Sequence, residues 1–150
     1  MKPLMKYIGR TERCAVLYRD EILSSYGLNG HQHTYIINIC QNPGISQDRL
    51  AKIIFVNKSN VARQLTLLEA NGFVLRKTSE ANRRQMEVYP TEKCLTLYPI
   101  IMDILGDWNK YLLDEFTDEE KSALLDMMEK VMLRAAKKLE NTLSKETDNE

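Results

Sequence analysis

A chain of 150 residues, of which 43% are apolar, has the size of one folded domain and enough apolar surface for a core. Its 21 basic and 21 acidic side chains balance, and no uninterrupted apolar run approaches the length of a membrane span. The first residues lack the apolar stretch of a signal peptide, and the three cysteines, Cys14, Cys40 and Cys94, are far apart. These features argue against a membrane protein and a disulfide framework, and they indicate a reducing cytoplasm.

Apolar residues at helical spacing predict a first helix over residues 4–26, which Gly27 ends. A second helix is expected to begin at a capping box, in which the side chains of Asn29 and Gln32 each accept a backbone N–H of the other. The turn sequence at Pro43 ends this helix.

Two short helices are expected next, over about 46–53 and 57–71. Ser46 and Asn57 stand at their starts, where a side-chain oxygen caps the free backbone N–H groups. Gly72 ends the second of these helices, because the residue after a helix often needs a positive φ, which glycine adopts without strain.

Two candidate strands follow, at 73–77 and 85–89, and the polar tip between them carries Arg83 and Arg84. A helix, a second helix and a hairpin with a basic tip form a winged helix-turn-helix. One helix of this motif enters the major groove of DNA, and the tip reaches an adjacent minor groove. We therefore predict a DNA-binding protein that is mainly α with a small two-stranded β wing.

Beyond the hairpin, Thr91 is expected to cap a long helix, and Thr117 with Glu120 forms a capping box for a last helix over 118–140. The apolar stripes of the first helix and of these two are too broad to be covered within so short a chain. A second subunit is the natural cover, and a two-fold symmetric dimer suits a palindromic operator. The polar residues 142–150 are expected to be a disordered tail.

The charge is unevenly distributed along the chain. Residues 28–90 hold eight basic and four acidic side chains, whereas residues 91–150 hold eight basic and fourteen acidic ones. A basic lobe is expected to meet phosphates. We therefore predict a single domain, 1–150, with a DNA-binding lobe at 28–90 and a helical dimerisation region at 1–27 and 91–141.

The first two turns of the helix over 57–71 are predicted to meet base edges. Asn60 and Gln64 are suited to adenine and Arg63 to guanine, through paired hydrogen bonds. A polar helix face is usually only solvated, but the capped turn before it and the wing after it favour DNA. The predicted contacts on this helix are Lys58, Ser59, Asn60, Arg63 and Gln64.

Other predicted contacts are with the DNA backbone and the minor groove. Ser46 and Gln47 lie at a helix N-terminus, where side chain and backbone N–H groups bind phosphate. Arg83, Arg84 and the nearby Lys77 are predicted to bind phosphate or enter the minor groove. The alternative is that the polar hairpin tip is only solvated, because polar hairpin tips are common in proteins of any function.

The chain resembles the MarR family of bacterial transcriptional regulators over nearly its whole length. Each matching segment is weak alone, but the ordered set is specific. The resemblance implies a homodimer with a winged-helix fold, a role usually as a repressor, and release by a small phenolic or lipophilic ligand or by an oxidant. The segments that carry it are 27–29 with Gln32, 43–46, 50–51, 57–63, 67–69, 72–76, Arg83-Arg84, 91–93, Tyr98-Pro99 and Trp108.

Two positions depart from the family pattern. The family usually has an Asp before the arginine pair of the wing, and this carboxylate braces the second arginine. Asn82 stands here and supplies no charge, so Arg84 is expected to be held less firmly. The family also tends to have Gly where Cys94 stands, and a helix accommodates a cysteine there.

The family's ligand cleft lies between the first helix, the second helix and the helix that begins at 92. An arginine in such a cleft can meet a carboxylate, although the same residues also suit packing or dimer contacts. Some members of the family sense peroxides with a cysteine on the first helix, and Cys14 lies on the predicted first helix here. The alternative is that Cys14 only contributes to packing. The candidate lining residues are Tyr7, Arg10, Cys14, Tyr18, His33 and Trp108.

Other classes of function have less support. His31 and His33 with Cys14 or Cys40 would make a metal site only if four ligands converged, so we expect no metal and no cofactor. An enzyme is not indicated, since there is no glycine-rich phosphate loop and no Ser/His/Asp order. The second candidate is a winged-helix protein-interaction module without specific DNA binding, which only Asn82 favours.

Overall fold

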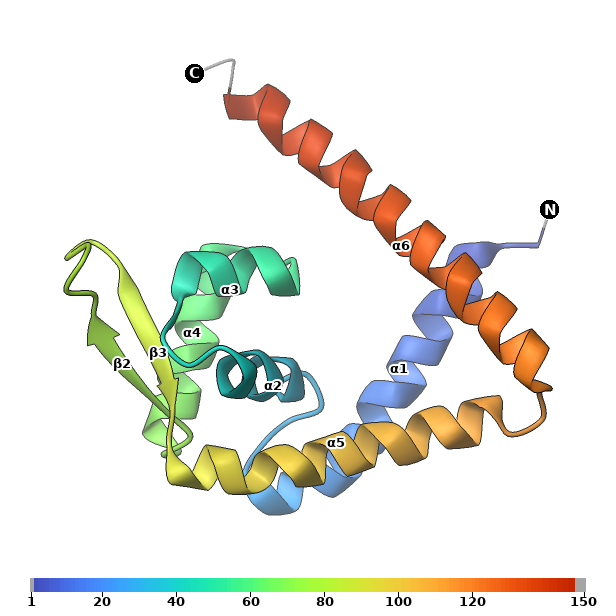
Figure 1. Ribbon diagram of the computed structural model, residues 1–150, viewed down its shortest axis with the longest axis horizontal. Helices are drawn as coiled ribbons and strands as arrows, with labels where there is room; N and C mark the ends of the chain where they lie inside the picture. The colour runs from blue at the N-terminus through green and yellow to red at the C-terminus, as the bar shows by residue number, and fades with distance from the viewer. Residues whose placement is uncertain (1, 148–150) are drawn as a thin grey trace. The chain divides into compact units, whose positions relative to one another are not determined.

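The computed structural model describes the backbone of residues 2–147 and the side chains of residues 2–140. It divides into two compact units, one up to Trp108 and one from Asn109 onward, and one long helix crosses the boundary. Within the described residues, no helix is long and apolar enough to span a membrane. In chain order the elements are α1 (Leu4–Leu23), η1 (Ser24–Tyr26), α2 (His33–Gln41), β1 (Ile45–Ser46), α3 (Gln47–Ile54), α4 (Lys58–Ala70), β2 (Val74–Thr78), β3 (Met86–Pro90), α5 (Glu92–Leu113) and α6 (Asp118–Thr147) (Figure 1).

The predicted caps and stops are present. At the five predicted starts a side-chain oxygen accepts the backbone N–H three residues on, although Asn29 caps the turn that precedes α2 and not α2 itself, which begins at His33. α1 begins after Pro3 with no side-chain cap, and Gly72 has the predicted positive φ, of +78°. These local signals fix where the helices begin and end. The pairs of acceptor and donor residues are Asn29 and Gln32, Ser46 and Arg49, Asn57 and Asn60, Thr91 and Cys94, and Thr117 and Glu120.

Gly30 anchors the start of α2 to α1. Its carbonyl accepts a hydrogen bond from Nε of Arg19 at 2.8 Å, and its N–H donates to the carboxylate of Asp20. A Cβ at this position would lie only 2.5 Å from the carbonyl oxygen of Val16, so no other residue fits without a backbone shift. The buried Arg19 also pairs with Glu12 at 2.8 Å, so its charge is compensated.

The sheet has three strands, in the order β1–β3–β2, and both pairings are antiparallel. Val74 pairs with Pro90 and Thr78 with Met86, which gives the predicted wing hairpin. The third strand, β1, pairs Ile45 with Val88 and was not predicted from the sequence. Two residues are too few to show an alternating pattern.

The core of the first unit is formed by α2, α3, α4, the sheet and the first part of α5. Val61, Leu65 and Leu68 lie on one side of α4 and are fully buried. Burial of each such side chain contributes about 1.5–3 kcal/mol, so this face orients the helix strongly. The opposite face of α4 is left for solvent or a partner.

The second unit has no comparable core. None of its residues from 109 to 140 is buried. α6 continues to Thr147, beyond the end near 140 that the sequence predicted, so residues 142–147 of the expected disordered tail are helical. Residues 148–150 of that tail lie outside the described part of the chain. The large apolar side chains exposed in this unit are Tyr111, Leu112, Phe116, Leu125, Met127, Met128, Met132, Leu133 and Leu139.

Candidate nucleic-acid interface

The exposed face of α4 begins at a rigid capped turn. Oδ1 of Asn57 accepts the backbone N–H of Asn60 at 2.7 Å and the hydroxyl of Ser59 at 2.9 Å. One turn further on, Arg63 is exposed and makes no hydrogen bond or ion pair within the described residues. Its guanidinium is therefore available to a DNA partner without the loss of an internal contact.

Asn60 and Gln64 are placed differently from Arg63. Both are half-buried and face α2, where Oδ1 of Asn60 accepts from the Tyr35 hydroxyl at 3.2 Å. Oε1 of Gln64 accepts from Nε2 of Gln32 at 3.1 Å. A paired contact with adenine needs both the oxygen and the nitrogen of an amide, so the two bonds to α2 would have to open first. Of the three side chains predicted to meet base edges, only Arg63 is therefore free of internal hydrogen bonds among the described residues.

The N-terminus of α3 is also partly occupied. The Ser46 hydroxyl oxygen accepts the Arg49 N–H at 3.1 Å, and the side-chain oxygen of Gln47 is buried without a partner among the described residues. Gln47 is the first residue of α3, and backbone N–H groups at a helix N-terminus suit a phosphate. Nζ of Lys58 lies 3.1 Å from Oδ2 of Asp48, an exposed pair that a phosphate can displace at little cost.

An ion pair holds the wing against α4. Oε2 of Glu69 accepts the backbone N–H of Arg76 at 3.0 Å, and Oε1 accepts from the Arg76 guanidinium at the same distance. The hydrogen bond from Arg76 lowers the pKa of the Glu69 carboxyl. Arg76 also donates to Thr66 at 3.2 Å. Arg76 therefore positions the hairpin relative to α4, the predicted recognition helix that enters the major groove, and is not a free DNA contact.

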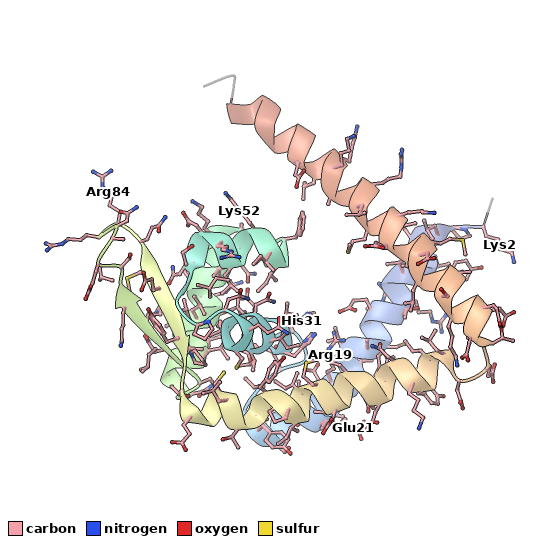
Figure 2. The ribbon with its side chains drawn as sticks, viewed as in Figure 1. Lys2, Arg19, Glu21, His31, Lys52 and Arg84 are labelled. Carbon is pink, nitrogen blue, oxygen red and sulfur yellow. The ribbon has the colours of Figure 1, made fainter. Side chains whose placement is uncertain are left out.

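The wing tip presents its two arginines to solvent. Arg83 and Arg84 are exposed, and their side chains have no hydrogen bond or ion pair in the described part of the chain. Figure 2 shows Arg84 at the tip of the hairpin, directed away from the strands. Oδ1 of Asn82 accepts the backbone N–H of Arg84 at 3.1 Å, so Asn82 shapes the turn and does not contact the guanidinium. Lys77 is exposed on β2, with Nζ 5.3 Å from the centre of the Tyr89 ring.

Only part of the predicted ligand cleft is assembled. Tyr18 and Trp108 stack, with ring centres 4.8 Å apart, whereas Tyr7, Arg10 and Cys14 are exposed along α1.

His33 is half-buried, and its Nδ1 bonds to the Gly30 carbonyl at 2.9 Å. Burial and the charge of Arg19 lower the pKa of His33 to about 4, against the opposing effect of the Gly30 bond. The ring is therefore neutral at pH 7.

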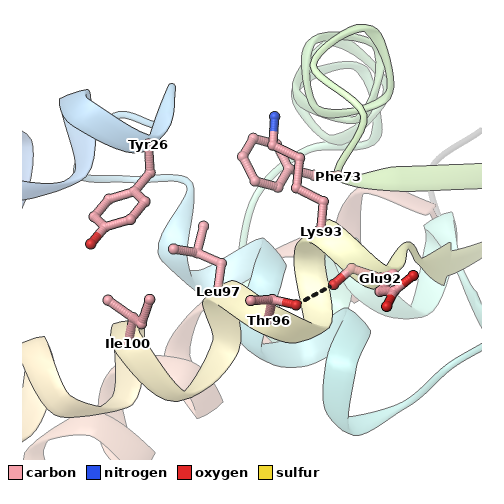
Figure 3. Close-up of a pocket in the computed structure, with 7 residues that line it drawn as sticks. All are labelled: Tyr26, Phe73, Glu92, Lys93, Thr96, Leu97 and Ile100. Carbon is pink, nitrogen blue, oxygen red and sulfur yellow. Dashed lines mark hydrogen bonds between the residues drawn. The ribbon is translucent and has the colours of Figure 1, made fainter.

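A cavity of about 440 Å³ lies elsewhere in the same unit (Figure 3). Nζ of Lys93 lies 4.3 Å from the centre of the Phe73 ring in its wall and donates to the Asn71 carbonyl at 2.8 Å. The cavity therefore contacts the segment that joins α4 to β2. None of the six predicted cleft residues lines it; its lining residues are Tyr26, Phe73, Glu92, Lys93, Thr96, Leu97 and Ile100.

The structure shows two features that the sequence analysis did not predict. Arg49 and Lys52 add exposed cations on α3, and Figure 2 shows Lys52 on the outer side of that helix. Cys40 and Cys94 lie in contact, although the sequence spacing suggested that the cysteines are independent. Among the described residues, no three potential metal ligands cluster, and His31 and His33 do not form a site.

A recognition helix with a free arginine, followed by a hairpin with a basic tip, is the architecture of winged-helix DNA-binding proteins. Comparisons with known proteins agree. A model of the MarR family matches residues 26–85. An uncharacterised HTH-type transcriptional regulator of Bacillus subtilis, YybA, is 29% identical over 131 residues, which is 87% of each chain.

Solved structures extend the similarity over almost the whole chain. A protein from Listeria monocytogenes, described as a MarR family transcriptional regulator in complex with a 26mer DNA, is 30% identical. Its TM-score is 0.86, over 92% of both chains. A MarR protein of Peptoclostridium difficile is 25% identical, with a TM-score of 0.89 over 92% of this chain and 91% of its own. The chain belongs to the MarR family of DNA-binding transcriptional regulators, which are not enzymes.

Proposed function

We propose that the protein is a homodimeric repressor that binds a palindromic operator in the cytoplasm and is released by a small ligand or an oxidant. The observation that carries this proposal is the set of exposed, unpaired arginines on the described part of one folded unit: Arg63 on α4, and Arg83 and Arg84 on the wing. One position suits a base edge in the major groove, and the other suits the minor groove. The relative that was solved with DNA supports the same partner for this chain.

The homodimer is supported by the lack of a core in the second unit. Residues 109–140 expose most of their apolar side chains, and a surface of this kind usually marks an interface. A second copy of the chain is the simplest cover, and two copies related by a two-fold axis read two half-sites. The dimerisation region is then 1–27 with 91–141, and the DNA contacts come from 28–90.

Selection from a pool of random duplex DNA tests the proposed function directly. We expect a palindromic sequence to be enriched, with an affinity that falls steeply as salt is raised, because lysine and arginine contacts to phosphate release counterions. Recovery of no preferred sequence would contradict operator binding. It would favour the alternative, a winged-helix protein-interaction module without specific DNA binding.

The dimer is tested by placing charges on α6. Leu125→Glu with Met132→Glu puts two carboxylates on exposed apolar positions seven residues apart, which lie on one helix face. We expect this variant to be a monomer in sedimentation and to lose operator affinity. Ser122→Glu adds a charge at an exposed polar position of the same helix and serves as the control. A monomeric wild type at micromolar concentration would contradict the proposal.

Release by a small ligand is supported by the cavity beside Phe73. Its apolar wall suits an aromatic or lipophilic molecule, and the Lys93 ammonium suits a carboxylate. We expect benzoate at millimolar concentration to weaken the operator complex. Thr96→Trp, which fills the cavity from an exposed lining position, is expected to remove the effect of benzoate. If the variant responds to benzoate as the wild type does, the ligand acts at another site, such as the cleft at Tyr18 and Trp108.

A further inference from the structure

Two cysteines that are 54 positions apart in the sequence meet in the fold. Sγ of Cys40, in the last turn of α2, lies 3.5 Å from Sγ of Cys94, in the first turn of α5. Both are free thiols, and the third cysteine, Cys14, is exposed on α1. The pair lies in the unit that ends at Trp108 and is not among the proposed DNA contacts.

The two sulfur atoms are near enough to form a disulfide after a small movement. An S–S bond is about 2.05 Å long, so the two sulfur atoms have to approach by roughly 1.5 Å. Each cysteine lies in a terminal turn of its helix, where the backbone adjusts more easily than in the middle. Beside the pair, Nε2 of Gln41 donates to the Tyr98 hydroxyl at 3.1 Å and holds the same two helices together.

The two thiols are not equivalent. Cys40 is half-buried, whereas Cys94 is fully buried. The hydrogen bond from the Cys94 thiol lowers the pKa of Cys40, while the same bond and burial raise the pKa of Cys94. The thiolate is the nucleophilic form of a cysteine. Cys40 is therefore the thiol that reacts first, and Cys94 is in place to react second.

We propose that Cys40 and Cys94 form an oxidation site, which a hydroperoxide closes to an intramolecular disulfide and which thereby weakens operator binding. The Cys40 thiolate attacks one peroxide oxygen, the O–O bond breaks, and an alcohol or water leaves with a proton from solvent. The Cys94 sulfur then attacks the Cys40 sulfenic acid, its proton is lost, and water leaves. In sum, two thiols are oxidised to one disulfide, and one hydroperoxide is reduced to an alcohol and water.

α2 connects this site to the recognition helix. The Tyr35 hydroxyl donates to Asn60, and Gln32, the residue before α2, donates to Gln64. α2 and its first turn therefore hold α4 through two side-chain hydrogen bonds. A disulfide at Cys40 pulls the C-terminal end of α2 toward α5 and shifts these two contacts. The effect on the operator rests on the proposed function, whereas formation of the disulfide does not.

Counting thiols tests the site. The purified protein is treated with hydrogen peroxide or cumene hydroperoxide, quenched, unfolded and labelled with a maleimide, and the adducts are counted by mass spectrometry. The reduced chain takes three adducts, one for each cysteine. We expect the treated chain to take one, on Cys14, and a peptide that links residues 40 and 94 to appear. Free thiols at both Cys40 and Cys94 after treatment, or dimers linked through a disulfide, would overturn the proposal.

The variants are chosen to separate the pair from the exposed thiol. Cys14→Ser removes the exposed cysteine and is expected to leave both the disulfide and its effect on DNA intact. Cys40→Ser is expected to abolish both. Cys94→Ala is used at the buried position, because a serine hydroxyl there would lose its hydrogen bonds to water. The melting temperature of each reduced variant checks that it folds, and the oxidised wild type should melt several degrees higher than the reduced one.

Operator affinity is then measured on the same samples. A several-fold loss on oxidation that dithiothreitol reverses, and that Cys40→Ser and Cys94→Ala do not show, supports the proposal. A disulfide that forms without any change in affinity overturns the regulatory role of the pair. If the reduced protein selects no operator at all, the proposed function fails, and the thiol count still decides whether the oxidation site exists.

Discussion

The unit that ends at Trp108 has a buried apolar core, whereas none of the residues from 109 to 140 of the second unit is buried. In the first unit, Leu65 and Leu68 of α4 are fully buried, and the helix can present its other face to DNA. In the second, Leu125 and Met132 of α6 are more than half exposed. We therefore expect the first unit to carry its own stability and the second unit to depend on the proposed second subunit to bury its side chains.

The largest expected effect is on the free energy of unfolding, when a leucine is truncated in the first unit and, for comparison, in the second unit. In the monomeric Leu125→Glu/Met132→Glu background, we expect Leu68→Ala to lower the free energy of unfolding by about 2–5 kcal/mol, because it leaves a cavity in the core. Leu133→Ala in the same background is expected to cost less than about 1 kcal/mol, since this side chain is 55% exposed. Urea unfolding measures both values. Equal losses would show that α6 is covered within one chain and would remove the contrast between the units.

A second difference is a half-buried histidine of the first unit, His33. His33 has a pKa of about 4 in the folded chain, against 6.5 for an unperturbed histidine, because of burial and the charge of Arg19. Between these pH values the unfolded chain binds more protons, so stability is present above pH 6.5 and is lost as the pH falls toward 4. We expect His33→Gln to remove part of this pH dependence in unfolding experiments. His31→Gln, at an exposed position, is the control, and an identical effect of both changes would contradict the assignment.

The free face of α4 gives the third prediction. Arg63→Ala is expected to weaken operator binding by about 1–3 kcal/mol and to reduce the discrimination between operator and random DNA, if the arginine pairs with guanine. Fluorescence anisotropy with both DNAs measures the two affinities. Equal weakening on operator and random DNA would make Arg63 a phosphate contact.

Asn60→Ala, on the same helix, tests whether a side chain with an internal partner affects DNA binding differently from the free Arg63. The Asn60 side chain is engaged by Tyr35, so its removal should act mainly through the position of α4 and should also lower the melting temperature. A loss of base discrimination without a change in melting temperature would return Asn60 to the predicted base contacts.

The sequence predicted most of the features that depend on neighbouring residues. Caps such as Ser46 and Asn57, the turn at Gly72 and the buried face of α4 all follow from spacings of a few positions. The same local pattern placed Arg83 and Arg84 at the tip of a hairpin, which the structure confirms.

The sequence was insufficient wherever a partner lies far along the chain. The hydrogen bond from Gln32 engages the side chain of Gln64, a predicted base contact, and it depends on how the start of α2 packs against α4. The meeting of Cys40 and Cys94 likewise depends on how α5 passes the end of α2. The spacing of residues along the sequence does not predict these contacts, because they depend on how the helices pack in the core.

The smallest expected effect concerns the wing tip, where the chain departs from its family. Asn82 accepts the backbone N–H of Arg84, so Asn82→Asp keeps this bond and adds a charge that can brace the guanidinium. We expect a gain of about 0.2–1 kcal/mol in operator affinity, as is usual for an exposed pair. The gain should vanish in an Arg84→Ala background, because the two residues act together. Repulsion between the new carboxylate and phosphate predicts the opposite, a loss of equal size in both backgrounds, and that result would show that residue 82 acts on the DNA directly and not through Arg84.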